Sequence, residues 1–88
     1  MKNVREPAAA FPLTCAARGE TVVLTDIYAG DTLRQRLMAL GLNVGMHVRV
    51  VQGALTGPVI LAVRNDARLA IGQGMAQKIM VKPVEGEA

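Results

Sequence analysis

The stretch Thr32–Val51, TLRQRLMALGLNVGMHVRVV, joins a helical pattern to a strand pattern without a linker. Its first half carries leucines at i, i+4 and i+7, the spacing of one buried helix face. These leucines are Leu33, Leu37 and Leu40. The spacing predicts a short helix over residues 32–40. A short helix followed at once by a strand is typical of a compact, mainly β domain.

Both ends of the predicted helix carry their own signals. Thr32 with Gln35 three residues later fits a capping box, in which a hydroxyl and an amide satisfy N–H groups of the first turn. Gly41 follows the last leucine, where helices commonly end in a left-handed residue. We expect Leu42 to fold back onto the helix after that turn.

After Gly45 the pattern changes to alternation, with Val48 and Val50 on one side and His47 and Arg49 on the other. Alternation of this kind, separated by turn residues, predicts five short strands in all. They cover residues 20–28, 46–52, 59–64, 67–71 and 79–82.

Turn residues connect these strands. Gly57 and Pro58 precede the third strand, at a position where a missing N–H is tolerated. Asn65-Asp66 is expected to join the third and fourth strands as a hairpin. Gly72-Gln73-Gly74 interrupts the pattern, and a further helical turn is expected near residues 75–78. The elements predict a small, strongly bent β barrel of about five short strands with one short helix.

A chain of 88 residues fits one domain with an aliphatic core, since it has one Phe and one Tyr. Residues 1–12 lack periodicity and are expected to be a disordered extension. Residues 13–83 are the predicted barrel domain, in which Leu13 tucks against the barrel. Residues 84–88 are expected to be a disordered tail.

Reactive side chains are few. One His, one Cys and no matching nucleophile and base predict no catalytic residues, so we do not expect an enzyme. His47 is the weak metal-ligand candidate, because no second His and no nearby Cys completes a site. No cofactor is expected, and a weak site for Fe²⁺ or another divalent transition metal stays open.

Composition also bears on partners. No segment has the 18 or more apolar residues of a membrane-spanning helix, and a single cysteine fits a reducing cytoplasm. We therefore expect a cytoplasmic protein without membrane insertion. The net charge of +3 comes from scattered residues, and Tyr28 is the one ring in the predicted barrel. Single-strand binders stack bases on such rings, so no nucleic-acid partner is expected.

The outward side of the predicted helix is the candidate partner-binding site. Helical spacing puts four residues there or at its edge: Arg34, Gln35, Arg36 and Met38. Met and Arg are both enriched in protein interfaces. Exposed strand edges in so small a barrel also leave weak self-association open.

The order of these motifs resembles the FeoA family. The resemblance runs through GE at 19–20, LRQRLMALGLNVGMHVRVV at 33–51, GPVILAV at 57–63, RLAIG at 68–72 and AQKIMV at 76–81. Most of the positions that match the family have a structural explanation. They are Arg36, Leu37, Leu40, Gly41, Leu42, Gly45, Gly57, Pro58 and Val59.

The resemblance implies an SH3-like barrel, the fold also found at the C-terminus of DtxR-type metal-dependent repressors. It also implies a small accessory protein of bacterial ferrous iron uptake that binds and modulates the FeoB membrane transporter from the cytoplasm, peripheral to the inner membrane. The family supplies no catalytic residues. Two alternatives remain open, a nucleic-acid-binding small barrel and a metal-responsive regulatory domain.

Overall fold

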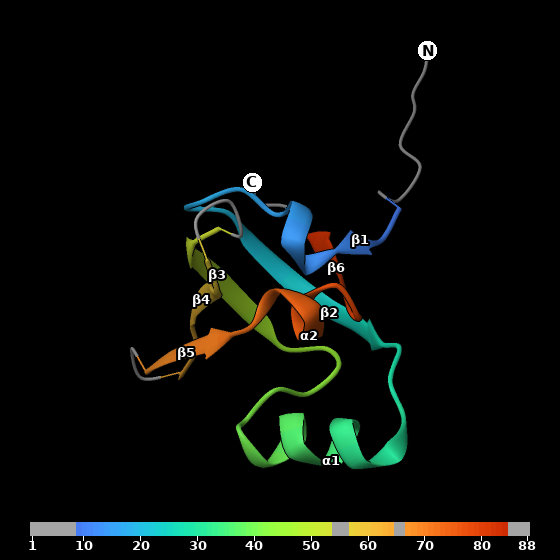
Figure 1. Ribbon diagram of the computed structural model, residues 1–88. Helices are drawn as coiled ribbons and strands as arrows, with labels where there is room; N and C mark the ends of the chain where they lie inside the picture. Colours follow the sequence, from blue (N-terminus) through green and yellow to red (C-terminus); the bar gives the residue numbers. More distant parts are fainter. Residues whose placement is uncertain (1–8, 54–56, 65–66, 85–88) are drawn as a thin grey trace.

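The computed structural model describes residues 9–53, 57–64 and 67–84. Six antiparallel strands form one sheet in the order β1-β6-β2-β3-β4-β5 (Figure 1). The strands are β1 (Phe11–Pro12), β2 (Thr21–Ile27), β3 (His47–Gln52), β4 (Val59–Ala62), β5 (Arg68–Ile71) and β6 (Ile79–Pro83). Two helices, α1 (Asp31–Ala39) and α2 (Gln73–Ala76), and a 3-10 turn, η1 (Leu13–Cys15), complete the described fold. The predicted mainly β architecture is confirmed.

Alternation along the strands builds the core. Val22 of β2 pairs with Val48 of β3, and Val50 of β3 pairs with Leu61 of β4. These residues are at most 2% exposed, whereas their neighbours along each strand face outward or lie half-buried. The short elements η1 and α2 contact each other beside the sheet. The core of the described residues is aliphatic, with no buried polar side chain among them.

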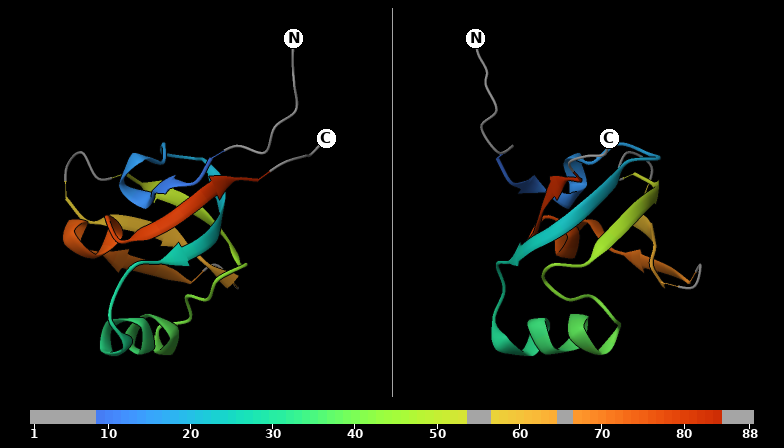
Figure 2. Two further views of the ribbon diagram at one scale, coloured as in Figure 1. Left: turned by 90° about the vertical axis from the view of Figure 1, so that its right-hand side faces the viewer. Right: turned by 180° about the vertical axis from the view of Figure 1, so that it is seen from behind.

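Helix α1 lies beyond the ends of β2 and β3, joined to the sheet by two connections (Figures 1 and 2). It begins one residue earlier than predicted, with Gly30 as the N-cap. The predicted capping box is therefore wrong, because Thr32 lies inside the first turn and Gly30 has no side chain to cap with. Asp31 in the first turn complements the positive end of the helix dipole.

The C-terminus of α1 agrees with the prediction. Gly41 has a φ of +100°, the left-handed conformation that favours glycine. The Gly41 N–H donates to the carbonyl of Met38, and the Leu42 N–H donates to that of Leu37. This pair of bonds is a Schellman motif, which satisfies carbonyls that the helix leaves unpaired. Leu42 then enters the core, where it is fully buried.

The buried face of α1 is narrower than predicted. Leu37 is fully buried and Leu33 lies half-buried, but Leu40 is 48% exposed. The prediction that Leu40 faces inward is wrong, because the helix ends at Ala39 and meets the barrel from one end of the sheet. Leu42, after the turn, supplies the next buried leucine instead.

The N-terminal boundary also differs from the prediction. Phe11 and Pro12, expected in a disordered extension, form β1 and pair with Val81 and Met80 of β6. Phe11 packs against the core, which explains why this short strand is held. Leu13 is 1% exposed, as expected. Residues 1–8 and 85–88 lie outside the described residues.

The last elements follow the predicted order with small shifts. Helix α2 occupies residues 73–76, so it begins two residues before the expected turn at 75–78. β4 begins at Val59, directly after the exposed Pro58. β4 and β5 pair as the predicted hairpin, while Asn65 and Asp66 lie outside the described residues.

Candidate docking surface

Exposed apolar side chains gather in the segment around α1. Four of the five large hydrophobic residues that the described structure leaves exposed lie between residues 28 and 44. They are Tyr28 (62% exposed), Met38 (53%), Leu40 (48%) and Val44 (52%). We call these four residues the helix surface. Because most of the large exposed apolar side chains fall in this one segment, it is the candidate docking surface.

Of the four predicted binding residues, three are exposed. Gln35, Arg36 and Met38 all face solvent. Arg34 lies half-buried, and its Nη1 donates a hydrogen bond of 2.7 Å to the carbonyl oxygen of Ile27 at the end of β2. Arg34 therefore holds α1 to the sheet, in addition to lying one turn before Met38 on the helix.

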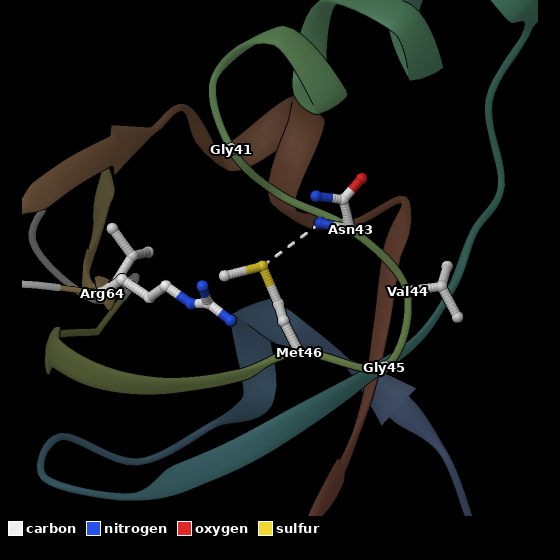
Figure 3. A pocket seen from close by; sticks show the side chains of 7 residues that line it. Gly41, Asn43, Val44, Gly45, Met46 and Arg64 are labelled. Carbon is white, nitrogen blue, oxygen red and sulfur yellow. Dashed lines mark hydrogen bonds between the residues drawn. The ribbon is translucent and has the colours of Figure 1, made fainter.

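The loop after α1 borders a pocket that the sequence did not reveal (Figure 3). The pocket has a volume of about 490 Å³ and is open to solvent. It is lined by Gly41, Asn43, Val44, Gly45, Met46, Val63 and Arg64. Gly41 and Gly45 separate the helical pattern from the strand pattern in the sequence, but the contribution of Val63 and Arg64 depends on how the β4–β5 hairpin folds back. No local pattern carries that information.

Two hydrogen bonds hold this loop against the sheet. The Gly45 N–H donates to the carbonyl oxygen of Leu24 at 2.7 Å, and the Leu24 N–H donates to that of Met46 at 3.0 Å. Gly45 has a φ of +95°, a left-handed conformation that favours glycine and turns the chain into β3. Within the loop, the Asn43 N–H donates to Sδ of Met46 at 3.2 Å. The exposed Val44 is thus carried on an anchored loop.

The described carboxylates have separate structural positions. Glu20 Oε1 accepts a hydrogen bond from the Ala17 N–H at 2.9 Å. Asp26 Oδ1 accepts one from the Ile27 N–H at 2.8 Å. Asp31 lies at the start of α1. Each of these three carboxylates therefore has a structural position in the part of the chain that the structure describes.

His47, the metal-ligand candidate, is the exposed first residue of β3. Among residues 9–53, 57–64 and 67–84, no three His, Cys, Asp or Glu side chains gather where they would hold a metal ion. Cys15 is an exposed free thiol at the end of η1. No helix within the described ranges has the length and apolar character to cross a membrane.

The sheet order and the short helices define a small SH3-like fold. Residues 11–83 match the family model of the FeoA domain. The chain belongs to the FeoA family. The match begins at Phe11, the residue that opens β1.

Known proteins agree with this assignment. A curated protein of Methanocaldococcus jannaschii, whose name proposes it as Fe(2+) transport protein A, is 40% identical over 75 residues, covering 85% of this chain and 89% of its own length. A crystal structure described as iron uptake regulatory protein (FeoA) is 32% identical, with a TM-score of 0.77 and coverage of 86% of this chain and 100% of that chain.

The barrel also occurs inside a larger protein. A manganese-dependent transcriptional repressor in complex with manganese matches with a TM-score of 0.77 and 22% identity. The match covers 88% of this chain but 38% of the repressor. This likeness concerns the fold, and it agrees with the predicted similarity to the C-terminal domain of DtxR-type repressors.

Proposed function

We propose that this chain is an accessory protein of ferrous iron uptake, acting on the cytoplasmic side of the membrane by binding and modulating the FeoB transporter. Membership of the FeoA family supports the link to iron uptake. So do the names of the M. jannaschii relative and of the matched iron uptake regulatory protein.

The observation that carries the docking role is the exposure of Met38 at 53%, with Leu40 and Val44 nearby in the chain and similarly exposed. Met adapts to irregular partner surfaces because its side chain is unbranched and polarizable. Arg36 and Gln35 supply exposed polar groups on the same helix. An apolar centre with polar neighbours is the usual composition of a protein interface.

Modulation requires that the bound chain distinguish two states of the transporter. A ligand shifts a conformational equilibrium only through different affinities for the two states. We propose that the helix surface contacts FeoB at a place that changes between these states. Arg34 and the Schellman turn keep α1 in one position on the barrel, so little conformational entropy is lost when the helix surface docks.

Uptake of radiolabelled ferrous iron tests the proposal. Cells that make FeoB but no FeoA-family protein are compared with and without this chain, at equal FeoB abundance. The proposal expects the chain to change the initial uptake rate in the presence of FeoB and to have no effect in its absence. An uptake rate that is the same with and without the chain contradicts it.

A further inference from the structure

On the outer face of strands β3, β4 and β5, two arginines lie on either side of one small residue. Arg49 pairs with Ala62, and Ala62 pairs with Arg68. Residues directly opposite one another in a sheet point to the same face, and both arginines are exposed. Their strands are two spacings apart, or about 10 Å. The space above Ala62 is therefore flanked by two guanidinium groups.

A third arginine joins them at the pocket. Arg64 follows β4 two residues after Ala62 and is exposed. Figure 3 shows its side chain extending toward the loop that carries Asn43 and Met46. We call Arg49, Arg64 and Arg68 the arginine surface. It is separate from the predicted binding residues of α1, and no inference from the sequence singled it out.

No described carboxylate neutralises the arginine surface. Glu20 binds the Ala17 N–H, while Asp26 and Asp31 flank the connection between β2 and α1. Within residues 9–53, 57–64 and 67–84, no hydrogen bond or ion pair joins these three arginines to an acid. Among the described residues, these arginines therefore have no acidic partner, and they lie beside a pocket whose lining includes Val63 and Met46.

We propose that the arginine surface binds an acidic segment of a partner protein, whether or not the helix surface binds the transporter. One carboxylate of the segment lies over Ala62 between Arg49 and Arg68. A second pairs with Arg64, whose planar guanidinium fits a carboxylate in a bidentate manner. An apolar side chain next to that carboxylate enters the pocket against Val63 and Met46.

Three features favour an acidic protein segment over other anions. Neither Phe11 nor Tyr28 lies on β3, β4 or β5, and His47 is the single aromatic ring of these three strands, so successive bases of a single strand have no row of rings to stack on. The pocket beside Arg64 has a mixed lining that includes Val63 and Met46 as well as Asn43, which suits an amino-acid side chain better than a phosphate. β5 ends the strand order, so an extended segment laid along it is offered backbone hydrogen bonds as well.

Fluorescence anisotropy with a labelled octapeptide of alternating glutamate and valine tests the proposal on the full chain. We expect saturable binding at about 50 mM salt that weakens at about 500 mM, because exposed charge pairs are screened. The same peptide with glutamine in place of glutamate should not bind. Arg64→Gln and Arg49→Gln should each weaken binding about fivefold or more, since each removes a charge-assisted contact.

A matched control removes one positive charge elsewhere. Lys78 is exposed in the connection between α2 and β6, and its carbonyl oxygen accepts a hydrogen bond from the Tyr28 N–H, at the opposite end of β2 from Thr21, the residue that pairs with Arg49. Lys78→Gln should bind the acidic peptide as the unmodified chain does. Circular dichroism and thermal unfolding verify that the variants are folded. Met38→Asp, which disrupts the helix surface, should also bind the peptide normally, so this proposal and the proposed function fail independently.

Several outcomes overturn the proposal. Equal affinity of the unmodified chain, Arg49→Gln and Arg64→Gln for the acidic peptide shows that the arginine surface does not bind it. Tighter binding of an oligothymidylate of equal length identifies a nucleic-acid surface instead. Tighter binding of phosphatidylglycerol vesicles, lost in the same two variants, identifies a lipid surface.

Discussion

The backbone N–H of Leu42 donates a hydrogen bond of 3.0 Å to the carbonyl oxygen of Leu37, and both leucine side chains are fully buried. The chain turns at Gly41, between these two residues. Leu37 at the end of the helix and Leu42 after the turn therefore both pack into the same core. This relationship fixes α1 at the end of the sheet. The helix surface depends on it, because Met38 and Leu40 lie between Leu37 and Leu42.

Gly41→Ala should lower the free energy of unfolding by about 1–2 kcal/mol, since an L residue is strained at a φ of +100°. A Cβ at this position meets nothing within 4 Å, so the loss comes from backbone conformation alone. Urea unfolding measures it. Gly74→Ala is the matched control, because Gly74 lies inside α2 without a positive φ and its Cβ also meets nothing. The control should be neutral or slightly stabilising.

Leu37→Ala should cost about 2–5 kcal/mol, because it empties a fully buried site. Leu40→Ala makes the same chemical change at a side chain that is 48% exposed, and should cost less than about 1 kcal/mol. Thermal unfolding of the two variants compares them directly. If the two variants were equally destabilised, Leu40 would be buried like Leu37, as the helical spacing of the sequence predicts. That result would contradict the exposure of Leu40 in the structure.

Arg34→Gln should destabilise the chain by about 1 kcal/mol, because it removes a charged donor from the half-buried carbonyl of Ile27. Amide exchange should also quicken in α1, which loses a tether to β2. Arg36→Gln, on the exposed side of the same helix, is the control and should change neither quantity measurably. If Arg34→Gln behaved like Arg36→Gln, the bond to Ile27 would contribute nothing to stability.

Phe11→Ala should lower stability by about 1–2 kcal/mol, less than for a fully buried ring because Phe11 is half-buried against the core. Tyr28→Ala removes the other ring of the chain, which is 62% exposed, and should change stability by no more than about 0.5 kcal/mol. Denaturant titrations of both variants decide whether β1 is part of the cooperative unit. An unchanged unfolding midpoint for Phe11→Ala would show that β1 is not part of the cooperative unit.

The sequence predicted those features whose cause is local. Alternation at Val48 and Val50 fixes which face of β3 is buried, and Gly41 followed by Leu42 marks the end of α1. These signals depend on strand period and backbone conformation, which act within a few residues.

The remaining features depend on contacts between distant segments. β1 has two residues and no period, and it is held by pairing with β6 at the other end of the chain. Leu40 has the spacing of a buried residue, but the position of the helix beyond the sheet leaves it exposed. Helical spacing places Arg34 on the outward side of α1, where a binding residue is expected. Its long side chain nevertheless reaches back to the carbonyl oxygen of Ile27. Tertiary structure decides all three.

Binding of the purified chain to FeoB, measured as a dissociation constant in detergent or nanodiscs, tests the central claim most directly. Met38→Asp places a charge on the helix surface and should raise the constant about tenfold or more, as expected for a residue central to an interface. Val84→Asp introduces the same charge at an exposed apolar residue beside Thr21, at the opposite end of β2 from α1. It should leave the constant within about twofold of the unmodified value. One dissociation constant shared by all three proteins, or no binding of the unmodified chain, contradicts docking through the helix surface.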